Sequence, residues 1–539
     1  VVDPVFIGLA QILGSTRDEV DVVRDSESSD NGVWLAYSVW FSATDRDLYV
    51  RRFNDDTNTG PLAFTDVTST WSTQRARCAY VAGADRAIIV FDRYFPTLQS
   101  NALRFHAHDR TDLSSNSNYT AIPASNNARR GDVGGTDFNS SGPTAVVVWQ
   151  QEPNAGPFGN TSSSDIYGCL VDVASETVGT PFAVASSGFG DHERPAVNQT
   201  ANGLADDSWR VAYQTLSTLV IGGSDDWDVY VRKIDLNGQV SAATEINGAS
   251  SDHKFAPIIE GNGSRYLVAF VTSPQVPGSV PQGINGHQIR VTRLDWSNSS
   301  GSGTEPWGTV ILQANSDPRL ELGGLGFDRR DDSHWALMFR SNVSEILYLR
   351  TVGYRGEQVQ AETVVDPAGS DTSVIGGVSF DETGDRFVLG YAINGQITYV
   401  TLALFLYPSV APAFASGISC SPATIAWVGS QQIGAEFPYV RVYNAPANAL
   451  HVLALATAPA SAILSGIPPF ENGCWLLIAN TGNEFLGLFG VEIGSSVFWY
   501  VKLPEFLTPD TYYFQGFHTI GGGGFDFVST QRLAVPTVR

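Results

Sequence analysis

A repeated pattern of four short strands is the sequence feature that most constrains how this chain can fold. Its clearest copy is residues 191–248, where apolar and polar residues alternate at 195–197, 209–213 and 229–234. The Asp-Leu-Asn-Gly sequence at 235–238 is typical of a hairpin turn, and a fourth short strand is expected after it. Because the pattern returns about every 60 residues and one unit cannot cover its own apolar face, it predicts the blades of a β-propeller.

The apolar second strand and the third strand that follows it occur in strict alternation, seven times each. This count predicts a seven-bladed β-propeller. The second strands are expected at 33–37, 87–91, 145–149, 209–213, 266–270, 335–339 and 387–391, and the third strands from Asp47, Ala102, Asp165, Asp228, Gln288, Ile346 and Ile397.

The seventh copy lacks a fourth strand of its own, because the chain runs from Leu404 directly into the proline-containing segment FLYPSVAPAF. Residues 5–10 precede the first copy and have the length and apolar character of the missing strand. We therefore expect residues 5–10 to pair with the seventh blade. Such closure by the N-terminal strand would remove the exposed sheet edges of an open array.

A fall in charge marks a domain boundary near residue 405. Residues 405–539 contain only seven acidic and four basic residues. Alternating runs at 437–443, 474–478 and 497–501 are separated by Gly, Pro and Asn, which predicts a β-sandwich of about eight short strands. The all-β chain is thus expected to hold the propeller at 1–404, a linker at 405–418 and the C-terminal β-sandwich at 419–539.

So small a number of charges on the predicted sandwich has two interpretations. Its surface is either covered by the propeller or exposes an apolar face that contacts other molecules. The sequence leaves both open.

Composition narrows the partners and the setting. The formal net charge of −23 argues against nucleic acid, because binding a phosphate backbone needs clustered Lys and Arg. No apolar run approaches the ~20 residues of a membrane helix, so no membrane span is expected. The only methionine is Met338, which favours removal of an N-terminal signal peptide and hence an extracellular protein, secreted or attached to the cell surface.

The four cysteines divide two and two by position. Cys420 and Cys474 both lie in the predicted sandwich and are expected to form a disulfide in an oxidising compartment. Cys78 and Cys169 lie in different blades and could bridge neighbours, but two separate buried thiols are the favoured prediction.

Two parts of the chain resemble known families. The blade pattern D-[HQ]-x-x-P-A-V, followed by an apolar strand and D-[IVL]-Y, resembles the propeller-forming repeats of large secreted bacterial adhesins and surface proteins, best in 191–248 and 252–313. The tail, with Cys420, the turn at 472–474 and the closing strand at 529–533, is similar to a C-terminal domain of many large secreted bacterial proteins. Both resemblances imply an extracellular setting, and neither implies a reaction.

A search for catalytic motifs finds none. The chain has no Gly-x-Ser-x-Gly elbow, no His-Glu-x-x-His helix, no phosphate loop, no zinc spacing and no Ser-x-Asp-x-Gly-x-Thr-Trp signature. Paired carboxylates for glycoside hydrolysis could still meet in space, but the sequence does not select a pair. The prediction is that the chain is not an enzyme.

Basic residues recur in the loops that lead into successive blades, on the face where the channel of a propeller opens. In so acidic a chain they predict a weak site for an anion, such as an acidic glycan or peptide. Most of these loops also contain an aspartate, for example Asp132 or Asp191, so the same charges could instead tie neighbouring blades together. The candidate ligand-binding residues are Arg17, Arg75, Arg129, His192, Arg194, His253, Lys254 and Arg319, with Arg77 and Arg130 beside them.

Two acidic clusters are candidate Ca²⁺ sites, because this ion prefers oxygen ligands at short spacing. They contain Asp45 with Asp47, and Asp226 with Asp228. Solvated turn residues are the alternative, and no other cofactor is expected.

Two classes of function lead. The first is a secreted structural or adhesive protein that self-associates into a homo-oligomer or polymer, such as a filament, sheath or surface array, through its low-charge C-terminal domain. The second is a ligand-binding propeller that captures an acidic glycan or peptide at the channel mouth. An enzyme that acts on polysaccharide is third.

Overall fold

The computed structural model divides the chain into one compact unit of Pro4–Leu404 and another that contains Phe405–Arg539. Regular structure is nearly all β, and the one helical element among the described residues is the short η1 (Ala82–Ala84). No helix in the described part of the chain is long and apolar enough to span a membrane. The structure describes residues 5–12, 17–25, 32–42, 45–53, 62–65, 72–95, 100–109, 120–123, 127–136, 142–152, 164–186, 190–201, 208–217, 226–246, 252–263, 265–274, 287–296, 302–305, 309–314, 320–328, 334–341, 346–353, 363–366, 376–381, 386–393, 396–403, 414–416, 424–428, 439–443, 449–456, 459–463, 475–478, 485–494, 497–500, 511–519 and 527–536.

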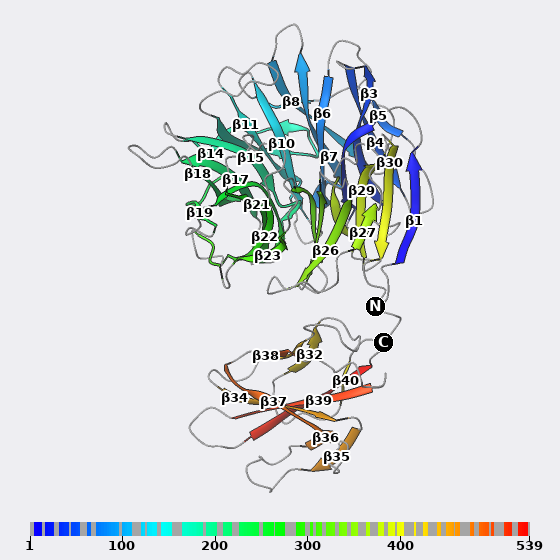
Figure 1. The fold of residues 1–539 in the computed structure, drawn as a ribbon, viewed down its shortest axis with the longest axis vertical. Coiled ribbons are helices and arrows are strands. Elements are labelled where there is room, and N and C mark those ends of the chain that lie inside the picture. Colours follow the sequence, from blue (N-terminus) through cyan, green and yellow to red (C-terminus); the bar gives the residue numbers. More distant parts are fainter. Residues whose placement is uncertain are drawn as a thin grey trace. The chain divides into compact units, whose positions relative to one another are not determined.

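The described strands of Pro4–Leu404 follow one another as seven antiparallel sets, numbered here in chain order (Figure 1). Within a set, strands that are neighbours in sequence pair with each other, as in a propeller blade. The first three sets are joined by parallel bridges, from Arg46 to Ser72 and from Val81 to Thr136. The unit therefore has the serial arrangement of a β-propeller.

The first four sets have the following bounds. Set 1 contains β2 (Arg17–Arg24), β3 (Val33–Ser42), β4 (Asp45–Phe53) and β5 (Leu62–Thr65). Set 2 contains β6 (Ser72–Val81), β7 (Arg86–Phe95), β8 (Ser100–Asp109) and β9 (Thr120–Ala121). Set 3 contains β10 (Ala128–Thr136), β11 (Thr144–Gln151), β12 (Asp165–Asp172), β13 (Thr177–Val178) and β14 (Phe182–Ala185). Set 4 contains β15 (Asp191–Val197), β17 (Ser208–Ser217), β18 (Asp226–Asp235) and β19 (Thr244–Glu245), and the intervening β16 (Thr200–Ala201) pairs with β10.

The last three sets complete the unit. Set 5 contains β20 (His253–Asn262), β21 (Arg265–Ser273), β22 (Gln288–Asp295) and β23 (Val310–Ala314). Set 6 contains β24 (Leu320–Phe327), β25 (His334–Ser341), β26 (Leu347–Gly353) and β27 (Thr363–Asp366). Set 7 contains β28 (Val378–Asp381), β29 (Arg386–Ile393), β30 (Gln396–Ala403) and β1 (Val5–Ile12).

The N-terminal strand β1 belongs to set 7, where it lies beside β30 (Figure 1). The two strands are antiparallel, and their register runs from Val5 opposite Ala403 to Ile12 opposite Ile397. This is the pairing expected for residues 5–10 from the sequence. It gives the edge of β30 a partner from the opposite end of the unit.

The second strand of a set is buried on both faces. In β11, Val146 and Val148 pack in one cluster with Val211 of β17, whereas Val147 packs in another with Ile88 of β7. The sequence of a strand that is covered on both faces is a continuous apolar run rather than an alternation of apolar and polar residues. The apolar runs that located these strands in the sequence therefore reflect contact with a set on either side.

The second unit contains three separate sheets among its described residues. One segment predicted to be a linker, 405–418, contains a strand, because β31 pairs with β40 through Phe414 opposite Ala534. The predicted linker is therefore too long, since part of it supplies an edge strand.

The five-stranded sheet of this unit contains, in spatial order, β31 (Phe414–Ser416), β40 (Phe527–Pro536), β39 (Thr511–Thr519), β34 (Ala449–Ala456) and β37 (Phe485–Gly494). The three-stranded sheet contains β32 (Thr424–Val428), β33 (Tyr439–Tyr443) and β38 (Val497–Tyr500). The third sheet is the pair of β35 (Pro459–Ile463) and β36 (Trp475–Ile478).

The cysteines of the first unit are two separate buried thiols. Cys78 and Cys169 are both free, which confirms the favoured prediction for this pair. Burial raises the pKa of the Cys169 thiol to about 12, so this sulfur stays protonated at neutral pH. Cys420 and Cys474 lie outside the described residues, and their disulfide stays a prediction.

Candidate functional site

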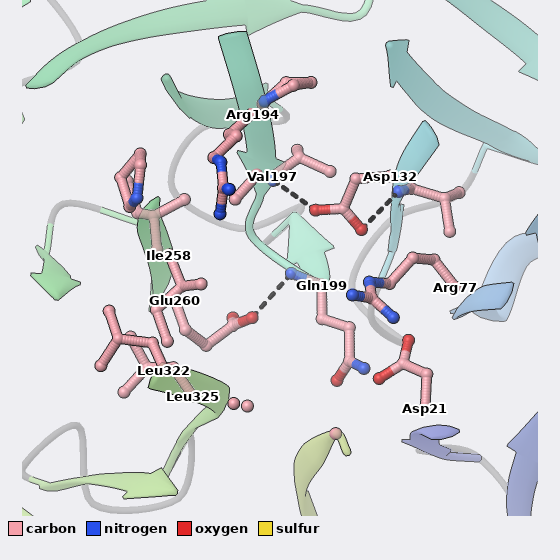
Figure 2. Close-up of a pocket in the computed structure, with 18 of the residues that line it drawn as sticks. Asp21, Arg77, Asp132, Arg194, Val197, Gln199, Ile258, Glu260, Leu322 and Leu325 are labelled. Carbon is pink, nitrogen blue, oxygen red and sulfur yellow. Dashed lines mark hydrogen bonds between the residues drawn. The ribbon is translucent and has the colours of Figure 1, made fainter. Parts of the chain in front are cut away.

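A cavity of about 370 Å³ lies where the first strands of the seven sets meet. We call β2, β6, β10, β15, β20, β24 and β28 the inner strands, because each of them, or the residues directly before it, lines this cavity. Figure 2 shows charged side chains from several inner strands that point toward one another. The central channel of a propeller is expected at such a position.

Six inner strands, β2, β6, β10, β15, β20 and β24, carry a β-bulge, where their register with the second strand shifts. In the bulges of β6, β10, β15 and β20 one residue other than glycine adopts a left-handed backbone conformation. Side chains make this conformation unfavourable, and such strain is concentrated at functional sites. The residues are Arg75 (φ 54°), Arg130 (φ 52°), Arg194 (φ 51°) and Ala256 (φ 50°).

Side chains of the preceding set hold three of these bulges in place. The acceptor in each case follows the aromatic residue that ends the apolar run of the second strand. The same device therefore fastens β10, β15 and β20 to the set before them. Asp92 accepts a hydrogen bond from the N–H of Arg130 at 2.8 Å, Gln150 from that of Arg194 at 3.2 Å, and Gln214 from that of Ala256 at 2.8 Å.

Three arginines, Arg75, Arg130 and Arg194, form a cationic cluster on consecutive inner strands. Arg75 makes a long ion pair with Asp92, at 3.5 Å. The Nε of Arg130 is buried and has no hydrogen-bond partner among the described residues. Burial and then the charges of Arg194, Arg75 and Arg129 lower the pKa of the Arg130 guanidinium. This cluster concentrates positive charge in a protein whose formal net charge is −23.

Three carboxyl groups line the cavity farther along the inner strands, and each accepts a hydrogen bond from the backbone of a neighbouring set. Asp132 accepts the N–H of Val197 at 2.8 Å, and burial raises the pKa of this carboxyl to about 7 (Figure 2). Asp21 accepts the N–H of Cys78 at 2.9 Å, and burial raises its pKa as well. The third group is Glu260. These groups join adjacent inner strands while they face the cavity.

Gln199, which follows β15, spans the cavity (Figure 2). Its N–H donates to Glu260 at 2.7 Å, and its carbonyl accepts the N–H of Gly135 at 2.8 Å. Its side-chain amide donates to the carbonyl of Val22 at 2.7 Å and more weakly to that of Cys78 at 3.4 Å. One residue of set 4 thus bonds to sets 1, 2, 3 and 5.

The wall opposite this polar surface is aliphatic. Ile258 of β20 and Leu322 and Leu325 of β24 lie together on one side of the cavity (Figure 2). None of the described residues that line the cavity is aromatic. The cavity therefore combines arginines, carboxyl groups and a hydrocarbon surface.

The structure distributes the predicted ligand-binding residues between two environments. Arg75 and Arg194 line the cavity. The side chain of Arg17 and all of Arg319 lie outside the described residues. Four others make local contacts and do not line the cavity, three of them buried and Arg129 partly buried. Arg129 pairs with Glu152, Lys254 with Asp228 at 2.7 Å, His192 with the hydroxyl of Thr215 at 2.9 Å, and His253 with the N–H of Trp227 at 3.3 Å.

The described members of this predicted group lie in strands rather than in loops, which corrects the sequence interpretation. For example, β15 begins at Asp191, although a strand was expected only from residue 195. The bulge at Arg194 interrupts the alternation by which a strand is recognised. Of the neighbouring Arg129 and Arg130, the sequence analysis placed Arg129 among the candidates with Arg130 beside it, whereas Arg130 lines the cavity.

Other lining residues had weaker signals in the sequence. Asp132 was interpreted only as a charge that ties blades together, a role that its bond to Val197 supports. Gln199 and Glu260 were not identified, because no local pattern marks a residue whose partners lie on other sets.

The two predicted Ca²⁺ clusters lie in strands rather than in loops. Asp45 and Asp47 are both in β4, and Asp226 and Asp228 are both in β18. Asp228 is already paired with Lys254. Within the described part of the chain, no group of three or more His, Cys, Asp or Glu residues is arranged to hold a metal ion.

Comparisons with known proteins give similarity in fold alone. No family model matches the chain, and no curated protein matches its sequence. Similar solved structures include the Dos1 propeller, at 7% identity and a TM-score of 0.38 over 74% of this chain and 95% of that one. They also include a Trypanosoma rangeli sialidase in complex with sialic acid, at 10% identity and a TM-score of 0.34 over 100% of this chain and 92% of that one.

An exo-β-1,3-galactanase from Phanerochaete chrysosporium is a further similar structure, at 10% identity and a TM-score of 0.28 over 99% of both chains. Because these similar structures include enzymes, the prediction that this chain is not an enzyme is corrected. That prediction used the absence of contiguous motifs, whereas the carboxylates of a glycosidase can come from separate strands. At these scores the likeness concerns the β-propeller fold and transfers no activity to this chain.

Proposed function

We propose that the chain is a seven-bladed β-propeller, closed by β1, that binds anionic ligands in the cavity between its inner strands. The seven strand sets, the pairing of β1 with β30 and the cavity that all sets share support this architecture. The proposed ligands are acidic glycans or peptides, because the planar guanidinium group of arginine matches the geometry of a carboxylate. In the same proposal the second unit, with its separate sheets, is a β-sandwich.

One observation carries the proposal, namely the guanidinium of Arg130 in the cavity. It has a buried Nε without a partner, and its neighbours include two further arginines. Of the charged groups that shift its pKa, three are arginines and one, Glu193, is an anion. A buried cation that is balanced so incompletely is costly, and a ligand carboxylate would supply further negative charge. A bound carboxylate would accept hydrogen bonds from this cluster and would neutralise part of its charge.

Local ion pairing accounts for other basic residues, including Arg75 of the cluster, but not for Arg130 and Arg194. Lys254 and Arg129 each have a carboxylate partner. Among the described residues, Arg130 and Arg194 make no ion pair. The alternative that basic residues only fasten the blades therefore fits Lys254, which pairs with Asp228 of the preceding set, whereas the pair of Arg129 with Glu152 lies within set 3. Anion binding fits Arg130 and Arg194.

The test compares two adjacent arginines by isothermal titration calorimetry with glucuronate and N-acetylleucine as carboxylate probes. Arg130→Gln should weaken binding by roughly tenfold to a hundredfold, because a hydrogen bond to a charged group contributes about 1.5–3 kcal/mol. Arg129→Gln, the matched control, should keep most of the affinity. It should instead lower the free energy of unfolding by roughly 1–3 kcal/mol, because the buried Glu152 loses its ion pair and keeps the hydrogen bond from Gln150.

If the proposal holds, Arg130→Gln therefore loses affinity for the probes, whereas Arg129→Gln loses stability and keeps most of its affinity. Equal affinities of the wild type and of Arg130→Gln for both probes, or no binding of either probe to the wild type in low salt, would contradict it. Glucose and N-acetylleucine amide, which lack the carboxylate, should not bind.

Secretion to an extracellular setting and self-association through the low-charge second unit stay predictions. Light scattering of the intact chain over a range of concentrations measures self-association, independently of the cavity.

A further inference from the structure

The cavity is divided into two chemically different halves. The arginine cluster lies on β6, β10 and β15, whereas the aliphatic wall lies on β20 and β24, with the carboxyl group of Glu260 of β20 beside it (Figure 2). Ile258, Leu322 and Leu325 supply that wall (Figure 2). A ligand that fills the cavity therefore meets cations at one side and hydrocarbon at the other.

The aliphatic wall discriminates between the two ligand classes. Sugar rings carry many hydroxyl groups, and a hydroxyl placed against a hydrocarbon surface loses its hydrogen bonds to water without replacement. Sugar rings are also commonly bound by stacking on aromatic side chains, and no described lining residue is aromatic. The wall therefore favours a hydrocarbon group over a sugar ring.

Charge and size limit the ligand further. The described lining contains four arginines and three carboxyl groups, so one positive charge is in excess when all are ionised. A second negative charge on the ligand would lie close to Asp21, Asp132 and Glu260. The volume of about 370 Å³ is near the lower end of the ~300–1,000 Å³ of small-molecule sites. The cavity thus suits a small group with a single carboxylate.

Resting on the proposed function, we propose that the cavity binds an aliphatic monocarboxylate. Its carboxylate is held by Arg75, Arg130 and Arg194, and its hydrocarbon part lies against Ile258, Leu322 and Leu325. The same chemistry is offered by a free branched-chain acid and by the C-terminal residue of a peptide that ends in leucine.

Calorimetry with four probes tests the inference. The probes are 4-methylpentanoate, its amide, glucuronate, and the acetylated tripeptide Gly-Gly-Leu with a free C-terminus. We expect 4-methylpentanoate or the tripeptide to bind at least tenfold more tightly than glucuronate, and the amide not to bind. Tighter binding of the free acid identifies a small molecule as the source, and tighter binding of the tripeptide identifies a peptide terminus.

Variants of the wall separate the hydrocarbon contact from the charge. Ile258→Thr should weaken the aliphatic probes by roughly tenfold, because the loss of a hydrocarbon contact in an apolar pocket lowers affinity by about that factor or more. It should leave glucuronate unaffected. Val178→Thr, a similar exchange on the outer strand β13, is the control and should change neither affinity. Leu322→Gln is a second wall variant at a half-buried position and should act as Ile258→Thr does.

The outcomes distinguish the two proposals. Binding of glucuronate without preference for an aliphatic probe would overturn this inference and leave the anion site intact. Binding of no carboxylate would overturn both. An aliphatic probe that binds the wall variants as tightly as the wild type would also overturn the inference, because the hydrocarbon would then lie elsewhere.

Discussion

At the scale of single residues, the carboxyl of Asp132 couples the cavity to pH. Burial raises its pKa to about 7, so the group is neutral below this pH and negative above it. A neutral Asp132 leaves more positive charge in the cavity. We therefore predict that affinity for a monocarboxylate rises by roughly threefold to tenfold between pH 8 and pH 6, as expected for one charge at a partly buried site.

Asp132→Asn tests this prediction, because its side chain does not titrate and the affinity should then change little with pH. Stability gives a second readout with a defined sign. A carboxyl with a raised pKa holds its proton in the folded state over a range where the unfolded chain has lost it. Its stabilising contribution is present in full below about pH 4 and is lost as the pH rises through about 7. An unfolding free energy that rises over this window because of Asp132 would contradict the assignment.

The choice between Arg129 and Arg130 shows what the sequence leaves undetermined at this scale. Neighbouring residues of a strand point to opposite faces, so one of the two had to face the cavity. The bulge between Arg129 and Asp132 shifts that alternation and cannot be recognised from a single sequence. Basic character at the inner strands could be predicted, but the arginine that lacks a partner could not.

At the scale of elements, the bulges depend on acceptors supplied by the preceding set. We predict that Gln214→Ala lowers the free energy of unfolding by roughly 1–3 kcal/mol, because the N–H of Ala256 loses its acceptor. Chemical denaturation measures the change. Gln239→Ala, at an exposed position of the hairpin after β18, is the control and should change stability by less than about 0.5 kcal/mol. Equal effects of both substitutions would show that the bulge does not need its acceptor.

Elements differ in how well their sequence predicts them. The second strand of set 4 was expected at 209–213 and is found at Ser208–Ser217, because burial on both faces selects a continuous apolar run. The inner strand β20 instead contains His253, Lys254 and the strained Ala256, a composition that resembles a loop. Its conformation is set by contacts with the neighbouring sets, and a local pattern does not report them.

At the scale of the whole molecule, the number of sets and the role of β1 follow from repetition, because a unit that cannot cover its own face needs a neighbour on either side. The cavity does not follow from repetition. Its lining comes from residues as distant in sequence as Asp21 and Val378, and its two halves arise because the repeats differ at equivalent positions. Architecture is shared by the repeats, whereas the ligand site depends on their differences.

Closure by β1 leads to a prediction for the whole first unit. Deletion of residues 1–12 removes the partner of β30 from Ile397 to Ala403 and leaves a free sheet edge. The thermal transition should shift to lower temperature. The loss should be roughly 3 kcal/mol or more, because several backbone hydrogen bonds worth about 0.5–1.5 kcal/mol each disappear together.

A synthetic peptide of residues 1–14, added to the truncated chain, should restore the transition by pairing with the free edge, as peptides do when they add a strand to a sheet. The same peptide with Ala10→Pro is the matched control, because proline cannot donate a backbone hydrogen bond opposite Tyr399. Rescue by the native peptide and not by the proline peptide would locate the effect in the β1–β30 pairing. A truncated chain that melts like the wild type would show that the ring holds without its N-terminal strand, and the proposed closure would then have to be abandoned.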